Sequence, residues 1–413
     1  MRNRARRFVD WVATNPVVAT LLAIVLGLLV GAVVIIATTS DVLNAWRHVF
    51  SSWGAPGHAL KLSLDNVGAA YRTMLVGSLG NPSAYWHTIT SGADATSTFT
   101  PISETLTYAI PLVIVAMGVG VAFQTGIFNI GANGQAIMGG IAGTAAGSMI
   151  HLPTVIHIPV VLICAIIGGV ITGLVPGLLK TYTGAHEVIV TLMLNYVVQA
   201  FLLYVLLSTP LQLPGQPNDV SRNLDPSARL APIFGTSSGL RVSWAILIAA
   251  TVVAFGWWFL ERSSLGFEFR VTGANPHAAR TAGINPRRII LLVFVISGGL
   301  AGLAGYAAAA STTYNLSGGF LVGSANIGFT AITVSLLGRN RPLGIVLSSL
   351  LFAALNVGGR TMQARTGIPL DLATVVQAAV VLFVATPIMV KEIFRLRTGT
   401  GPRVALATQG WSS

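Results

Sequence analysis

Ten apolar segments, with few charges inside them, limit the fold of this sequence more than any other feature. They lie at residues 17–37, 103–123, 133–150, 159–179, 187–208, 243–260, 289–311, 326–338, 343–358 and 371–390. A membrane-spanning helix needs about 20 apolar residues, so the short eighth and ninth segments must be tilted, broken or extended by their flanks. Only 9% of the residues are charged, against about 25% in soluble domains. We therefore predict an all-α polytopic membrane protein with about ten transmembrane helices.

The positions of lysine and arginine predict how the chain crosses the membrane. With both termini in the cytoplasm, 16 of the 24 basic residues fall on the cytoplasmic side. Arg360 and Arg365 fall on the outer side and break the rule. The net charge of +12 is scattered over the ends of apolar runs, so it indicates orientation in a cell membrane and not a nucleic-acid partner. The first apolar run is longer than the core of a signal peptide, so we expect it to be retained as a membrane helix.

Three regions follow from this topology. Residues 1–100 hold the first membrane helix and an extracytoplasmic segment, residues 101–390 form the transmembrane domain, and residues 391–413 form a cytoplasmic tail. In the first region Leu60, Leu64, Val67, Tyr71 and Met74 share one helical stripe. This pattern fits a helix lying on the outer membrane surface, and it fits equally a helix packed on the bundle.

Glycines and prolines predict local features of the transmembrane domain. Gly139, Gly143 and Gly147 repeat every four residues, as do Gly169/Gly173 and Gly298/Gly302, a spacing that lets helix backbones approach closely. The segment 208–240 contains five prolines and is expected to be a non-helical cap or loop. Such a cap could receive an extracellular partner or simply link two spans.

A polar stretch, residues 270–288 within the cytoplasmic loop 261–288, carries two matched helix-start signals. Asn275-Pro276 and Asn285-Pro286 each read as an N-cap followed by proline at the first helical position. Gly283 is suited to end the short helix between them. We interpret this short helix as a cytoplasmic element that receives mechanical work from a partner protein, through Asn275, Pro276, His277, Ala278, Ala279, Arg280, Ala282 and Gly283.

Motifs for chemistry are missing from the sequence. The three lysines, Lys61, Lys180 and Lys391, follow no glycine-rich loop, so we expect neither ATP binding nor another cofactor in this chain. His151 and His157 have no carboxylate or cysteine nearby in sequence, so no metal site is expected. No nucleophile elbow or carboxylate pair is present, so we do not expect an enzyme.

Polar groups inside the apolar segments are almost all uncharged, which argues against ion-coupled transport. They could line a path for a neutral polar solute, or make hydrogen bonds between helices. The candidates are Asn129, Asn133, Gln135, Asn195, Gln199, Asn356 and Gln377. The first three lie in a glycine-rich stretch, residues 125–140, that is expected to form a bent turn at a cavity or a simple tight turn.

Four motifs in this sequence resemble those of the permease subunit of ABC-type importers. They are GIFNIGANGQAIMGG (126–140), GLLKTYTGAHEVIVTLMLNYV (177–197), GANPHAARTAGINPRRIILLVFVISGGLAGLAGY (273–306) and GFTAITVSLLGRNRPLGIVLSSLLFAALNVGG (328–359). The most similar branch transports nucleosides, beside branches for simple sugars and branched-chain amino acids. The first motif departs from the family pattern, because Asn133 stands where a glutamate is usual.

The resemblance implies an import complex for nucleosides or a related neutral, sugar-like solute. It implies a cytoplasmic ABC ATPase subunit, with two cassettes in one chain, that binds ATP and Mg²⁺. A second permease subunit, typically a paralogue, and an extracellular substrate-binding lipoprotein complete the assembly in the membrane lipids. Residues 276–282 correspond to the coupling helix of the family.

Two other functions are alternatives to this one. The chain could be an ATP-independent carrier or channel for small polar solutes. It could also be a membrane scaffold or an enzyme of lipid-linked chemistry, which would need a reactive cluster at the membrane edge that the sequence does not offer.

Overall fold

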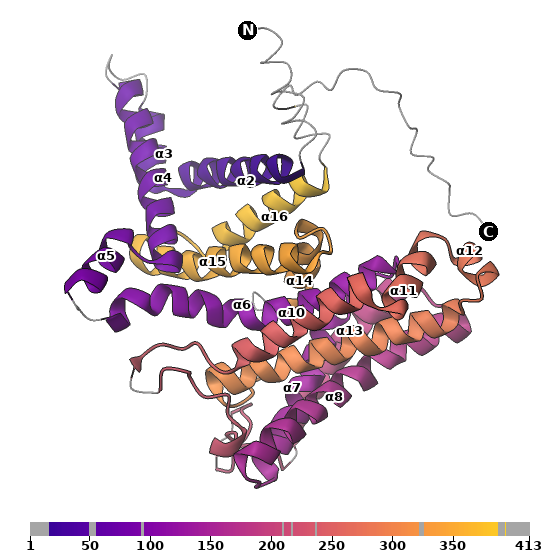
Figure 1. Cartoon of the computed structure of the whole chain (residues 1–413). Coiled ribbons are helices and arrows are strands. Elements are labelled where there is room, and N and C mark those ends of the chain that lie inside the picture. Colours follow the sequence, from indigo (N-terminus) through magenta and orange to yellow (C-terminus); the bar gives the residue numbers. More distant parts are fainter. Residues whose placement is uncertain are drawn as a thin grey trace, which may run out of the picture. The chain divides into compact units, whose positions relative to one another are not determined.

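The computed structural model describes residues 16–48, 55–91, 95–208, 210–215, 218–235, 238–321, 326–386 and 393. Within these ranges the chain is helical, with isolated β-bridges and no strand (Figure 1). Each of the ten apolar segments corresponds to one helix. These helices are α2 (Pro16–Thr38), α6 (Ala95–Gln124), α7 (Ala132–Met149), α8 (Thr154–Thr183), α9 (Glu187–Ser208), α10 (Ala245–Arg262), α13 (Pro286–Ala308), α14 (Ile327–Leu337), α15 (Pro342–Thr366) and α16 (Asp371–Ala385).

Among the described residues, seven helices are long and apolar enough to cross a membrane, which confirms a polytopic all-α protein. The short ninth segment is extended by its flanks into the 25 residues of α15. The helices α14 and α16 are apolar but shorter, and α7 is a largely buried helix rich in glycine and alanine. Both termini lie outside the described residues apart from Ile393, so their placement in the cytoplasm and the tail 391–413 stay predictions.

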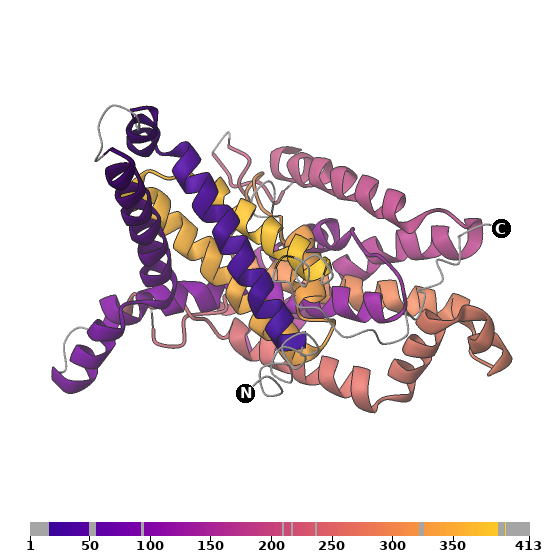
Figure 2. The same ribbon diagram turned by 90° about the horizontal axis from the view of Figure 1, so that it is seen from above.

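The chain divides into two compact units, Met1–Val67 with Asp371–Ser413, and Gly68–Leu370. In the first unit α2 lies beside α16 (Figure 2), and Ala23 and Leu26 form a small core with Ala379 and Phe383. The helix α3 (Ser40–Arg47) is joined to the start of α4 (Ala55–Leu79) by a hydrogen bond of 3.0 Å from Trp46 Nε1 to Ser63 Oγ. The predicted regions 1–100 and 101–390 follow membrane topology and not this division, and they stay predictions.

The stripe predicted for residues 60–74 does not have one uniform environment in α4. Leu60 and Leu64 are 53% and 63% exposed, whereas Met74 is buried. Met74 belongs to the second unit, where its backbone lies so close to Gly358 of α15 that a Cβ there would be 2.3 Å from the Met74 carbonyl oxygen. The last part of α4 therefore packs on the bundle, and α5 (Pro82–Ser91) follows it.

The second unit is built around a close crossing of α7, α8 and α13. A Cβ on Gly139 of α7 would lie 2.1 Å from Gly302 Cα, and a Cβ on Gly302 would lie 2.3 Å from the carbonyl oxygen of Ala165 in α8. A Cβ on Gly169 would lie 2.1 Å from the carbonyl oxygen of Gly298. Because lipid gives helices no hydrophobic reason to associate, such backbone contact is a main source of packing energy. The glycine spacing therefore predicted helix packing correctly.

Among its described residues, the proline-rich segment after α9 has no α-helix, as predicted, and it includes the short 3₁₀ helix η1 (Pro226–Ala228). Isolated bridges pair Gln212 with Ser221 and Pro232 with Ser243, and a third joins Val220 to Ser317 beyond α13. This cap is thus attached to the end of α13 as well as folded on itself.

Two glycines of α13 test the role of the crossing. We expect Gly302→Ala to lower the stability of the protein by about 3 kcal/mol, because its Cβ would overlap fixed backbone atoms. Gly299→Ala is the matched control, since its Cβ would meet only the side-chain methyl groups of Ile166 and Val170 at 3.3 Å. Thermal unfolding in detergent, followed by size-exclusion chromatography, measures the melting temperatures of both variants. Equal melting temperatures for the two variants would contradict this account of the crossing.

Candidate functional site

The short helix predicted in the polar loop is present as α12 (Pro276–Thr281), between α11 (Ser264–Ala274) and α13. Asn275 Oδ1 accepts hydrogen bonds from the backbone N–H of His277 at 2.9 Å and of Ala278 at 3.1 Å. Pro276 occupies the first helical turn. Asn285 Oδ1 accepts from Arg287 N at 3.1 Å and starts α13 in the same way. Both capping predictions are confirmed.

The two faces of α12 have different roles. His277, Ala278, Arg280 and Ala282 are exposed, whereas the side chain of Ala279 is fully buried. The carbonyl oxygen of Ala279 accepts a hydrogen bond of 3.0 Å from the backbone N–H of Ile284. Gly283 has φ of +81°, a left-handed conformation that glycine adopts without strain, and its place is fully exposed. Ala279 therefore anchors the short helix, and the other side chains are available to a partner.

The helix α11 connects α12 firmly to the membrane helices. Phe269 is fully buried and makes an edge-to-face contact with Phe259 of α10, with ring centroids 5.2 Å apart. Arg270 Nη1 donates a hydrogen bond to the carbonyl oxygen of Leu260. The helix α12 is therefore joined through α11 to α10, and it is followed directly by α13.

The side-chain amides near the glycine-rich turn bond to one another or to its backbone. Asn129 Nδ2 donates to Gln135 Oε1 and to Ser297 Oγ, both at 2.9 Å. Asn195 Oδ1 accepts from Gly134 N at 2.8 Å, and its Nδ2 donates to the carbonyl oxygen of Ile130 at 3.0 Å. These contacts hold the turn at residues 125–131 against α7, α9 and α13.

The other uncharged candidates lie apart from this group. Asn133 Nδ2 donates to the carbonyl oxygen of Leu321 at 3.1 Å, and its Oδ1 accepts from Gly328 N at 3.4 Å. Asn356 Oδ1 is buried without a hydrogen-bond partner in the described part of the chain. Gln199 is half-buried on α9, and Gln377 is half-buried on α16. That the seven uncharged side chains predicted from the sequence line a pathway stays a prediction.

A polar cavity of about 380 Å³ lies in the second unit, between α6, α14, α15, the cap and the end of α13. None of the seven amides lines it, although Val357 beside Asn356 does. Its polar and aromatic lining comes from residues that the sequence did not single out as a site: Glu104, Thr107, Tyr108, Arg241, Thr312, Thr313, Ser317, Phe320, Thr330 and Arg360. Thr312 and Thr313 belong to the π-helix η3 (Ala309–Thr313), a helix type that often marks functional sites.

The charges of this cavity are two guanidinium groups and one carboxylate. Arg241 Nη1 lies 3.3 Å from Glu104 Oε1, and the guanidinium of Arg360 lies 5.5 Å from the centre of the Tyr108 ring. A second polar cavity of about 440 Å³ shares Glu104 and Val357 and is lined by Arg365. Both arginines that break the positive-inside rule thus line cavities, and that violation was the signal that could have found this site.

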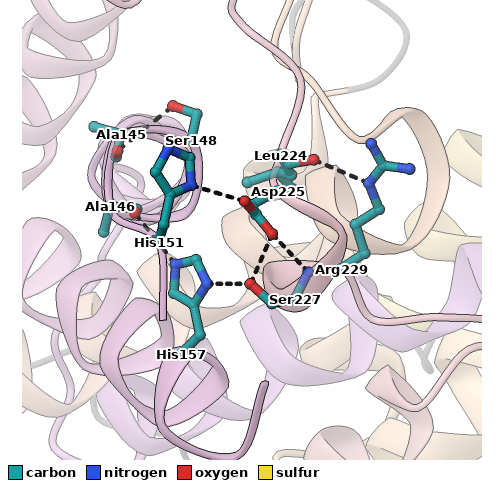
Figure 3. Close-up of polar contacts among 9 residues, drawn as sticks. All are labelled: Ala145, Ala146, Ser148, His151, His157, Leu224, Asp225, Ser227 and Arg229. Carbon is teal, nitrogen blue, oxygen red and sulfur yellow. Dashed lines mark hydrogen bonds and ion pairs between the residues drawn. The ribbon is translucent and has the colours of Figure 1, made fainter. Parts of the chain in front are cut away.

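A further polar cluster attaches the cap to the α7–α8 hairpin (Figure 3). Asp225 Oδ2 lies 2.8 Å from His151 Nδ1, and its Oδ1 accepts from the backbone N–H and the hydroxyl of Ser227. His157 Nδ1 lies 2.7 Å from Ser227 Oγ. The fold therefore gives His151 the carboxylate neighbour that its sequence surroundings lack. Even so, no group of three potential ligands for a metal ion occurs among the described residues.

The pKa of Asp225 predicts how this attachment depends on pH. The backbone N–H of Ser227, then its hydroxyl, then His151, lower the pKa of Asp225 to about 2. A carboxyl whose pKa is lowered by folding stabilises the native state above its ordinary pKa of about 4 and loses this effect as the pH falls toward 2. We expect Asp225→Ala to speed hydrogen exchange of residues 221–230 between pH 5 and 8, and this difference to shrink below pH 4. A difference that already vanished at pH 5 would contradict this assignment.

Comparisons with known proteins agree with the membrane fold. Residues 101–385 match the model of a family described as branched-chain amino acid transport system / permease component. The guanosine ABC transporter permease protein NupP of Bacillus subtilis is 33% identical, over 71% of this chain and 83% of its own length. The glucose permease TsgB13 of Haloferax volcanii is 33% identical, over 69% of this chain and 76% of its own length. The nucleoside permease NupB of Lactococcus lactis is 30% identical, over 92% of this chain and 93% of its own length. No solved structure matches the chain significantly.

Proposed function

Because this chain belongs to the branched-chain amino acid transport system / permease component family, we propose that it is the multi-pass permease subunit of an ATP-driven importer of nucleosides. The similarity to a nucleoside permease over almost the whole length of both chains carries this proposal. A glucose permease of similar identity makes a neutral, sugar-like solute the alternative substrate class.

The polar cavity beside η3 suits part of the solute path. A nucleoside presents a flat base and a ribose with hydroxyl groups. Tyr108 and Phe320 offer aromatic faces for the base, and Glu104, Thr312 and Thr313 offer hydrogen-bonding groups for the ribose. The Glu104–Arg241 pair keeps the charge of the cavity low, as an uncharged solute requires.

The exposed face of α12 suits contact with an ATPase. The helix is capped by Asn275, anchored by Ala279, and linked through α11 and Pro286 to two membrane helices. A rigid helix of this kind transmits a displacement that a flexible loop would absorb.

The partners proposed are those that such an importer requires. They are a cytoplasmic ATPase subunit with two cassettes in one chain, which holds ATP and Mg²⁺, a paralogous second permease, and an extracellular substrate-binding lipoprotein. We also place both termini of this chain and the loop 261–288 in the cytoplasm.

Proteoliposomes that hold this chain alone should show no uptake, and uptake without ATP would favour a self-sufficient carrier instead.

Transport by the assembled complex tests the cavity. We expect Tyr108→Ala to reduce uptake of radiolabelled nucleoside about tenfold, because one aromatic stacking surface is lost. Tyr182→Ala is the matched control, since Tyr182 is 71% exposed on α8 and does not line the cavity. A panel of nucleosides and sugars identifies the solute. Equal uptake by the two variants would remove the cavity from the proposed path.

Charged substitutions test α12. We expect Ala278→Asp and Ala282→Asp to abolish coupling of ATP hydrolysis to uptake or to prevent ATPase assembly, while the permease still inserts, because both side chains are exposed. Ser264→Asp adds the same charge at an exposed position in the same loop and serves as control. ATPase co-purification and solute-stimulated hydrolysis measure the effect. Normal uptake by both Ala278→Asp and Ala282→Asp would refute the role of this helix.

A further inference from the structure

An apolar groove of about 610 Å³ runs between α6, α10 and α15 in the second unit. Four residues of α6, six of α10 and four of α15 line it, and all fourteen side chains are apolar. It shares no residue with the two polar cavities, so it does not belong to the proposed solute path.

The groove has a buried floor and a projecting rim. Ile110 and Ala249 on its floor are 3% and 7% exposed, whereas Leu343 and Trp257 on its rim are 76% and 45% exposed. Contacts between membrane helices usually rely on small residues that allow close approach, as at the α7–α8–α13 crossing. Here large side chains stand above small ones and leave a channel between them, which suits a narrow, flexible occupant.

The length of the groove matches one leaflet of a bilayer. It follows α10 from Ile246 to Trp257, eleven helical steps or about 16 Å. The hydrocarbon core of a bilayer is about 30 Å thick, so one leaflet is about 15 Å deep. An acyl chain that enters from the end near Trp257 would fill the groove along its length.

Arginines without a carboxylate partner among the described residues lie at that end, whereas Arg241, five residues before Ile246 at the other end, is paired with Glu104. The guanidinium of Arg262 lies 5.3 Å from the centre of the Trp257 ring, and Arg341 directly precedes Pro342, the first helical residue of α15 and part of the groove wall. Both arginines are exposed, and neither forms an ion pair with a carboxylate among the described residues. Glu261, the neighbouring acidic residue, lies about 100° around α10 from Arg262.

The start of α15 adds to this charge. Its N-cap residue, Arg341, makes no side-chain capping hydrogen bond. The backbone N–H groups of the first turn of α15 therefore have no side-chain cap, and a helix N-terminus favours an anion at this position. The mouth of the groove thus has Arg262 over the Trp257 ring on its α10 wall, and Arg341 with the start of α15 on its α15 wall.

We propose that the groove binds one acyl chain of an anionic phospholipid, with the phosphate held at Arg262 and Arg341. An acyl chain alone would explain the apolar wall, and the charge at the mouth selects the anionic headgroup. A second protein subunit on this face is the competing occupant, and it would not require two unpaired arginines at one end of the groove.

Native mass spectrometry of the full chain in neutral detergent tests the proposal, with phosphatidylglycerol and phosphatidylcholine of identical acyl chains. We expect phosphatidylglycerol to bind more tightly. Each of Arg262→Ala and Arg341→Ala should weaken its binding about fivefold and weaken phosphatidylcholine much less, because the choline cation of that lipid opposes the attraction of its phosphate to the arginines. Arg287→Ala with Arg288→Ala removes two exposed arginines at the start of α13 and should change neither lipid. Equal binding of the two lipids, or equal loss in the control, would overturn the proposal.

A groove-filling variant gives an independent test. Ala254 is an exposed alanine on the groove wall, so Ala254→Leu adds bulk to the channel without disturbing the buried core. We expect it to reduce the binding of both lipids at least threefold. If it instead left lipid binding intact and lowered the mass of the permease assembly, a second subunit would be the occupant and the lipid proposal would be wrong.

Discussion

The structure of the larger unit depends on contact between bare backbones at one helix crossing. Gly302 lies against Gly139 on one side and against Ala165 and Gly169 on the other, so that α13 touches α7 and α8 at nearly the same level. A membrane provides no hydrophobic force to hold helices together, and only glycine leaves room for this approach. The amide cluster around Asn129 and the cap are placed by helices that meet at this crossing, and α13 continues from it to η3 at the polar cavity.

The short helix α12 and the cavity lie near opposite ends of α13 and its extension η3. The helix α13 begins at the cap of Asn285, directly after α12, passes through the glycine crossing, and ends in the π-helix whose threonines line the cavity. Only residues 282–285 separate α12 from this helix, which then runs to the cavity without interruption. This connection gives the proposed coupling a physical route, in the form of one stiff helix and not a chain of indirect contacts.

The sequence predicted the parts of the protein that are encoded locally. The ten helices follow from runs of apolar residues, and both helix starts in the polar loop follow from Asn-Pro pairs. The cavity could not be found in this way, because Glu104, Arg241 and Arg360 are far apart in the chain and meet only through the packing of α6, α15 and the cap. The same is true of Asp225 and His151, which are separated by more than 70 positions. The amides were recognised as unusual, but whether they bond to one another or face a cavity depends on helix rotation, which the pattern of residue types does not specify.

The amide cluster at the glycine-rich turn has a consequence for the electrical behaviour of transport. Asn129, Gln135 and Asn195 carry no charge, and Asn133 is neutral where related sequences are expected to have a glutamate. Moving one elementary charge through the membrane potential costs about 2.3 kcal/mol per 100 mV. Since the side chains that tie these helices together are neutral, their rearrangement moves no charge through the field. Among the residues that line the cavity, Glu104, Arg241 and Arg360 carry the charges that would make a transport step sensitive to voltage.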